Sequence, residues 1–164
     1  MSSIFEHAWS YPAPRSLIFD AWTKPEHLKN WWGPAGMKIG TCSLDLAPGG
    51  MFHYSMIAPD GNESWGRFVF EEVQAPHRLV WINSFSDQVG GITRHPTEPT
   101  WPLNLWCGVD FNEEDGLSNL RMKAHAHEAT DQEQKTFASN FDSMKQGFAG
   151  TFEQLSQYLK AIVE

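Results

Sequence analysis

The sequence contains only two cysteines in 164 residues, and Cys42 and Cys107 lack the C-x-x-C spacing of zinc and redox sites. Strand-like residues flank both, so we expect two buried free thiols in a cytoplasmic protein. The chain also lacks a long apolar run and a basic N-terminal segment. We therefore expect no membrane insertion and no signal peptide.

Positive charge is scarce as well, because 12 Lys and Arg stand against 20 Asp and Glu, for a net charge of −8. This balance argues against a nucleic-acid backbone or an anionic membrane surface as the partner. The G-x-S-x-G, P-loop, G-x-G-x-x-G and H-E-x-x-H motifs are absent. No cofactor is therefore expected.

Aromatic residues are abundant, with eight Trp and eleven Phe. Such side chains fill a core or line a cavity for an apolar molecule. Several of them fall in the C-terminal segment Thr130–Glu164, which has the 3.6-residue period of one helical face. Thr130 and Glu133 form a capping box, and no proline follows, so we predict one long helix. Its apolar stripe consists of Phe137, Phe141, Met144, Phe148, Phe152, Leu155, Leu159 and Ile162.

The N-terminal part predicts a strand over Ser3–Tyr11 and then two short helices. Leu17, Ile18, Ala21 and Trp22 share one face of the first helix. A second T-x-x-E pattern at 23–26 is expected to cap the second helix, which ends near Trp31-Trp32.

The middle of the chain alternates as strands do, with turn signals between the segments. The predicted strands are Met37–Leu46, a segment around Phe52–Met56, Trp65–Val73, Leu79–Phe85, Leu103–Phe111 and Leu120–Ala126. The proline- and glycine-rich segment Ser86–Pro102 is expected to be a long loop, with Trp101 suited to a lid. The order of elements predicts a single α+β domain over residues 1–164.

No group of ionisable residues forms a convincing catalytic or metal site. His125 and His127 share a strand face with Arg121 and Lys123, whose charge would repel a metal ion. His53 lies opposite an apolar strand face, so it should point outward. Strand alternation is expected to send one carboxylate of Glu71-Glu72 to each face of the sheet. Glu113-Glu114-Asp115 is expected to be solvated in a hairpin turn, and Asp45 and Asp110 are expected on polar strand faces.

The aromatic residues are instead the candidate ligand site. Tyr54 and the Trp indoles carry polar groups that need partners when buried. Gly147 and Gly150 flank Phe148 in the predicted helix, where glycine is unfavourable unless something approaches the backbone closely or the helix bends. The candidate ligand-binding residues are Trp32, Phe52, Tyr54, Met56, Trp65, Phe68, Trp81, Phe85, Trp106, Phe148 and Phe152.

Four segments together resemble a known family: Ala21–Pro34, Asp45–Phe52, Ala58–Gly61 and Ala75–Trp81. The chain resembles the activator-of-heat-shock-protein-90-ATPase homologues, a branch of the START-like or SRPBCC superfamily. The resemblance implies a helix-grip fold, in which a curved antiparallel sheet of about six to seven strands wraps the long C-terminal helix. Two short helices close one end, and an apolar cavity lies between sheet and helix.

Within this resemblance, Trp32 and Gly33 match the end of the short-helix pair, and Gly49-Gly50 matches the turn into a cavity strand. Pro76, Arg78 and Leu79 match the turn before the next strand; the family supplies no fixed catalytic residue at any of these positions.

Three functions stay open at this point. The first is binding of a small hydrophobic or aromatic molecule. The second is a polyketide cyclase or aromatase activity, which needs an inward titratable group such as Tyr54, His53, Asp110 or Arg67. The third is a chaperone-interaction module, and the resemblance also allows a homodimer.

Overall fold

The elements form because apolar residues alternate along the strands and recur every three or four residues along the helices. The computed structural model describes residues 3–163, so the last predicted helix residue, Glu164, lies outside them. In these residues the strands are β1 (Phe5–Tyr11), β2 (Lys38–Leu44), β3 (Met51–Ile57), β4 (Glu63–Gln74), β5 (Arg78–Ser86), β6 (Ile92–Thr93), β7 (Leu105–Glu114) and β8 (Leu117–Ala126). The helices are α1 (Arg15–Thr23), α2 (Pro25–Leu28), α3 (Asp131–Ser139) and α4 (Phe141–Val163).

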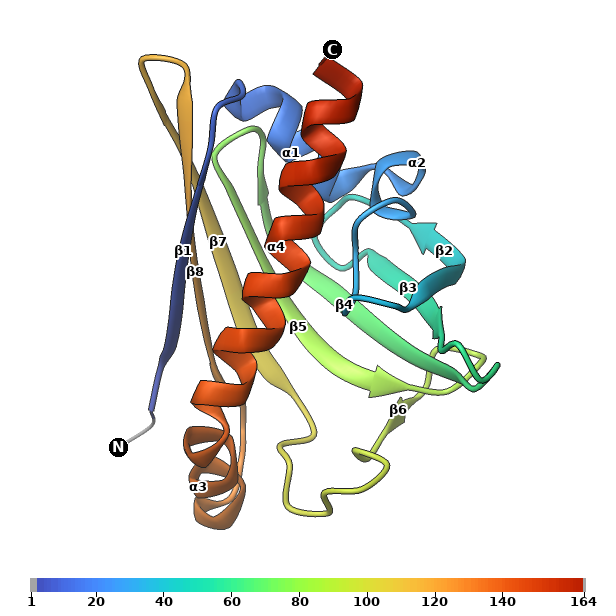
Figure 1. Ribbon diagram of the computed structural model, residues 1–164. Coiled ribbons are helices and arrows are strands. Elements are labelled where there is room, and N and C mark those ends of the chain that lie inside the picture. The colour runs from blue at the N-terminus through green and yellow to red at the C-terminus, as the bar shows by residue number, and fades with distance from the viewer. Residues whose placement is uncertain (1–2, 164) are drawn as a thin grey trace.

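One antiparallel sheet of eight strands holds all of the described strands, in the order β1-β8-β7-β5-β4-β3-β2, with β6 paired to β5. The sheet curves around α4, which crosses its inner face, while α1 and α2 close one end (Figure 1). This arrangement confirms the helix-grip prediction. The sequence missed β6, because its two residues are too short to show alternation.

Register shifts between Ile39 and Cys42 and between Phe70 and Glu72 help the sheet to bend. The second shift corrects the prediction for Glu71 and Glu72. Simple alternation would send one carboxylate to each face, but the bulge leaves both exposed.

The predicted C-terminal helix is in fact two helices, α3 and α4, separated at Asn140. The helix α3 ends where the Asn140 backbone N–H donates to the carbonyl oxygens of Phe137 and Ala138. The Asn140 side-chain amide donates to the Thr136 carbonyl oxygen at 2.7 Å. A side-chain amide that competes with the backbone in this way disfavours continuous helix. The capping box of Thr130 and Glu133 is present as predicted.

The second predicted capping box is wrong. The Thr23 hydroxyl donates to the Phe19 carbonyl oxygen at 2.8 Å inside α1, and Lys24 precedes α2 without a side-chain cap. Pro25 occupies the first turn of α2, where the absence of its N–H leaves no donor unsatisfied.

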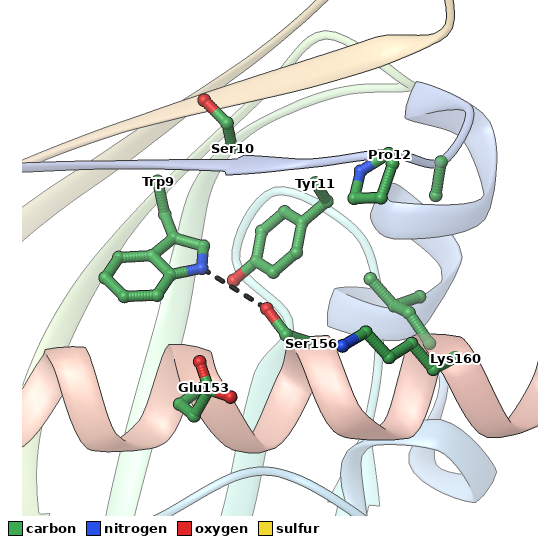
Figure 2. A pocket seen from close by; sticks show the side chains of 9 residues that line it. Trp9, Ser10, Tyr11, Pro12, Glu153, Ser156 and Lys160 are labelled. Atoms are coloured by element: carbon green, nitrogen blue, oxygen red, sulfur yellow. Dashed lines mark hydrogen bonds between the residues drawn. The ribbon is translucent and has the colours of Figure 1, made fainter.

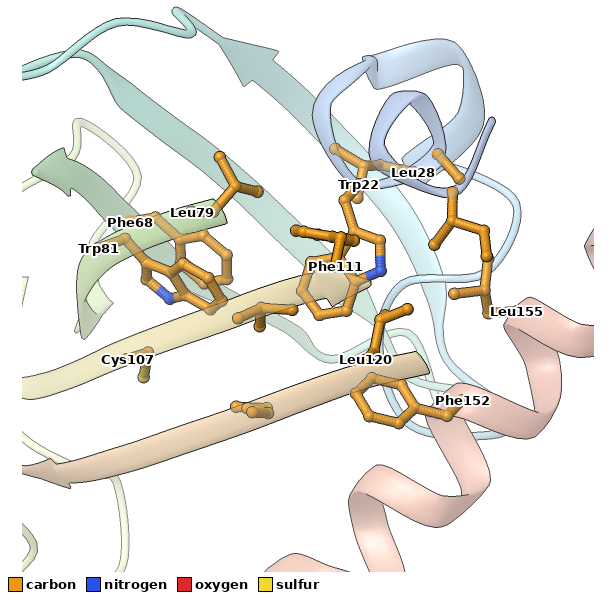
Figure 3. Packing of buried hydrophobic residues seen from close by; sticks show 14 of the residues in the cluster. Trp22, Leu28, Phe68, Leu79, Trp81, Cys107, Phe111, Leu120, Phe152 and Leu155 are labelled. Carbon is orange, nitrogen blue, oxygen red and sulfur yellow. The ribbon is translucent and has the colours of Figure 1, made fainter. Parts of the chain in front are cut away.

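The apolar stripe of α4 is buried unevenly. Phe152, Leu155 and Leu159 are buried against the sheet and the short helices, whereas Met144 and Phe148 are only half-buried. Phe152 and Trp22 pack together in the core (Figure 3). The Trp22 ring also contacts the rings of Trp31 and Trp81. In the described residues, no helix is both long and apolar enough to cross a membrane.

Replacing Phe152 by Ala should lower the free energy of unfolding by about 3–5 kcal/mol, because this ring is 1% exposed and its loss leaves a cavity. Urea unfolding measures the loss. The control is Gln157→Ala, an exposed position on the same helix, which should change stability by less than about 0.5 kcal/mol. A loss below about 1 kcal/mol for Phe152→Ala would contradict the packing of α4 described above.

His7 gives the core a pH dependence. Its imidazole is buried beside Phe5, Trp9 and Phe152, and its Nε2 atom has no hydrogen-bond partner among the described residues. Burial first, and then the charge of Lys145, lower the pKa of His7 below its ordinary value of 6.5. The unfolded chain therefore binds more protons than the native state as the pH falls through this range.

We expect the melting temperature to fall from about pH 7 to about pH 5, and His7→Phe to reduce this fall, because Phe cannot take up the proton. Differential scanning calorimetry across this range measures the effect. His77→Gln, at an exposed position, is the control and should leave the slope unchanged. Equal slopes for His7→Phe and the unmodified protein would show that His7 does not carry the effect.

Candidate functional site

A cavity of about 250 Å³ lies between the middle of α4 and the sheet. Its walls come from the connection after α2, from strands β3 and β5, and from α4. The lining residues are Trp32, Gly33, Pro34, Tyr54, Met56, Asn83, Met144, Gly147, Phe148 and Thr151.

The connection after α2 is held against α4 by hydrogen bonds to one carbonyl group. The Gly33 carbonyl oxygen accepts from the Thr151 hydroxyl at 3.1 Å and from the Gln154 side chain at 2.7 Å. Gly33 has a φ of 99°, and a Cβ atom there would lie 3.0 Å from the sulfur of Met56. Glycine therefore allows this segment to approach β3 and form the mouth of the cavity.

A smaller space of about 40 Å³ lies deeper in the core. Trp32, Asn83, Met144 and Phe148 line both spaces, so the two adjoin. The other residues around the deeper space are Phe68, Trp81, Leu105, Cys107, Met122 and Ala124. The hollow narrows inward because aromatic rings fill most of the space between sheet and helix.

Six of the eleven predicted residues line these two spaces. Trp32, Tyr54, Met56 and Phe148 line the larger space, Phe68 and Trp81 line the deeper one, and Trp32 and Phe148 line both.

The other five predicted residues lie elsewhere. Phe52 and Phe152 are core residues, each 1% exposed. Phe85 packs against His95, with ring centroids 4.9 Å apart. Trp65 and Trp106 lie on the outer face of the sheet, where they stack on His53 and His125. Successive side chains of a strand point to opposite faces of the sheet. Since Phe68 in β4 and Cys107 in β7 point inward, Trp65 and Trp106 point outward.

The loop Ser86–Pro102 does not cover the cavity, which corrects the expectation of a lid there. None of its residues lines either space. Arg94 instead forms an ion pair with Glu133, the Thr100 and Thr136 hydroxyls are hydrogen-bonded, and the Trp101 ring packs on Phe137. These contacts hold the loop against α3.

Asn83, Met144 and Gly147 line the cavity but are not among the predicted ligand-binding residues. Asn83 could have been found, since it shares the inward phase of β5 with Trp81 and Phe85. The close approach to the helix backbone that Gly147 and Gly150 predict is absent, because a Cβ atom at either position would meet nothing within 4 Å. Gly147 instead leaves the mouth of the cavity open.

The polar groups of the lining gather around Tyr54. Its ring lies over Gly66, where a Cβ atom would be 2.5 Å from the tyrosine oxygen. Burial raises the pKa of Tyr54 to about 12, and the neighbouring polar side chains of Trp32 and Asn83 offset part of this rise. The phenol is therefore neutral at pH 7.

Two further polar groups in this part of the core, the Trp81 indole and the Cys107 thiol, are uncharged. The Trp81 indole nitrogen has no hydrogen-bond partner among the described residues and lies on the side of its ring toward Cys107 (Figure 3). Burial raises the pKa of the Cys107 thiol, which keeps it protonated. The two spaces are thus lined by neutral side chains.

The other candidate titratable groups point away from the cavity. His53, Arg67 and Asp110 are on the outer face of the sheet, where Asp110 and Glu72 each pair with Arg78 at 2.8 Å. No group of three or more His, Cys, Asp or Glu residues in the described part of the chain is placed to hold a metal ion.

A separate groove of about 510 Å³ lies on the opposite side of α4, beside β1 (Figure 2). Trp9 and Tyr11 point from β1 toward the helix, and Glu153, Ser156 and Lys160 lie along it. The Trp9 indole donates to the Ser156 hydroxyl at 3.3 Å, so this polar group already has a partner. The charged walls make the groove less suitable for an apolar molecule than the neutral cavity.

Known proteins share this architecture. A protein from Arthrobacter aurescens has a TM-score of 0.79 at 22% identity, covering 96% of this chain and 86% of that chain. Protein Ms6760 from Mycobacterium smegmatis has a TM-score of 0.76 at 21% identity, covering 97% and 92%. The AHSA1 protein from Silicibacter pomeroyi has a TM-score of 0.66 at 16% identity, covering 97% and 99%. Identities this low show a common fold alone.

No curated protein sequence matches the chain. The sequence profile described as Activator of Hsp90 ATPase homolog 1-like protein, however, matches residues 12–160. This match covers nearly the whole chain, and the curved sheet around α4 agrees with the fold that the sequence resemblance implied. The chain therefore belongs to the Activator of Hsp90 ATPase homolog 1-like family.

Proposed function

We propose that the protein binds a small hydrophobic or aromatic molecule between the sheet and α4. The observation that carries this proposal is the open, mostly apolar cavity of about 250 Å³ under Met144, Gly147 and Phe148. The same helix is tightly packed against the core at Phe152 and Leu155, so the neutral cavity lies beside the middle of the helix only.

The volume sets the size of the ligand. An apolar cavity of about 150 Å³ in another protein takes up benzene, and natural ligand pockets begin near about 300 Å³. The cavity and its deeper extension therefore suit a molecule of one or two fused rings. With about ten non-hydrogen atoms, such a molecule would bind with a Kd on the order of 10–100 µM.

An enzymatic role as a cyclase or aromatase has less support. General acid–base catalysis needs a group that changes protonation near the working pH. The titratable side chains of the two spaces are Tyr54 and Cys107, and burial raises the pKa of both. Preorganised binding is therefore the function that this lining favours.

The family description raises a third function, action on the Hsp90 chaperone ATPase. We propose a cytoplasmic location with either role, which the two free thiols support. Stable co-purification with the chaperone, without any response of the cavity residues to small apolar molecules, would favour this function over the first.

The variant Gly147→Leu tests the binding proposal. A leucine side chain at this position would enter the mouth of the cavity, which is open within 4 Å of the Cβ site. We expect naphthalene to shift the [13C]methyl resonances of Met56 and Met144 in the unmodified protein, and Gly147→Leu to weaken this binding at least about 10-fold.

Gly150→Leu is the matched control. Residue 150 lies in the same helix and its substitution raises helix propensity equally, but it does not line the cavity. It should bind naphthalene as the unmodified protein does. If naphthalene leaves Met56 and Met144 unshifted, or if both leucine variants bind equally well, the cavity is not a binding site.

A further inference from the structure

The hydrogen bonds around Tyr54 leave one donor unused. A tyrosine oxygen accepts up to two hydrogen bonds and donates one. The Trp32 and Asn83 side chains lie beside this oxygen in the cavity wall, and none of the hydrogen bonds of the described residues includes it. The hydroxyl hydrogen has no acceptor among the hydrogen bonds of the described residues, although Tyr54 is only 6% exposed and lines the cavity.

The Asn83 amide leaves one acceptor unused. Its nitrogen donates to the Arg67 carbonyl oxygen at 3.2 Å. The amide oxygen then has no donor among the described hydrogen bonds, and Asn83 lines both the cavity and its deeper extension. A donor and an acceptor therefore lie side by side in the wall of an apolar space.

The lining also restricts the charge of the ligand. Neither space has Asp, Glu, Lys, Arg or His in its wall. A carboxylate or an ammonium group would lose its hydration there without gaining an opposite charge. An uncharged group that both donates and accepts a hydrogen bond matches the wall.

We propose that the ligand is an uncharged ring compound with a hydroxyl group, of the phenol class, whose oxygen accepts from Tyr54 and whose hydrogen is donated to Asn83. This inference rests on the proposed function and narrows it to one ligand chemistry. A ketone could use only the Tyr54 donor, and an unsubstituted ring could use neither group. Leaving both buried groups unpaired lowers affinity for the unsubstituted ring.

The experiment compares three two-ring probes at pH 7: 2-naphthol, naphthalene and 2-naphthoate. The methyl resonances of Met56 and Met144 report on occupancy of the cavity. We expect the unmodified protein to bind 2-naphthol at least about 10-fold more tightly than naphthalene, since one or two hydrogen bonds are gained. We expect 2-naphthoate to bind at least about 10-fold more weakly than 2-naphthol, because its charge has no partner.

Two substitutions test the residues. Tyr54→Phe removes the donor and Asn83→Leu removes the acceptor, and each should reduce the preference for 2-naphthol over naphthalene to about 3-fold or less while naphthalene still binds. The control is Tyr158→Phe, which removes a hydroxyl hydrogen-bonded to His27 outside the cavity. It should keep the full preference.

The outcomes separate this inference from the proposed function. If 2-naphthol and naphthalene bind the unmodified protein equally, or if 2-naphthoate binds as tightly as 2-naphthol, the phenol assignment is wrong and the apolar site stands. The assignment is also wrong if Tyr54→Phe and Asn83→Leu keep the full preference. If neither neutral probe shifts Met56 and Met144, the proposed function fails as well.

Discussion

The contact between α4 and the curved sheet is the interaction on which the rest of the structure depends. Phe152, Leu155 and Leu159 bury one end of the helix against Trp22 and its aromatic neighbours. Burial of apolar side chains is the main favourable contribution to the free energy of folding. Because α4 packs closely at Phe152, Leu155 and Leu159 but only partly at Met144 and Phe148, the same helix that stabilises the fold also leaves the cavity beside its middle.

Periodicity predicted most of the helices and strands, whereas the wrapping of the sheet around the long helix was implied by the family resemblance. The alternation in β7 and β8 and the apolar stripe of α4 are signals of burial, and burial is what the structure shows. Local hydrogen bonding was harder to predict. Asn140 divides the helix through its own side-chain amide, and Thr23 donates within α1 instead of capping α2. Such competition between side chain and backbone has no periodic signature.

The site was predicted less well, because composition identifies aromatic residues but not the face that each one occupies. Trp65 and Trp106 are as bulky as Trp32 and Trp81, yet they stack on histidines outside the sheet. Asn83 is the opposite case, because it lines the cavity but was not among the predicted residues. It is a polar residue at an inward strand position, and this conflict between residue type and burial is a sequence signal of function that aromatic counting overlooks.

The uneven packing of α4 has a consequence for how this architecture diversifies. The end of the helix at Phe152–Leu159 is fixed by close packing, and the preceding helix α3 is secured separately by its capping box and by Arg94. The helical turn between these two regions, residues 144–148, contributes less to this packing, because Met144 and Phe148 are only half-buried. Substitutions there are free to reshape the interior without unfolding the molecule, so homologues with one backbone can diverge in what they accommodate.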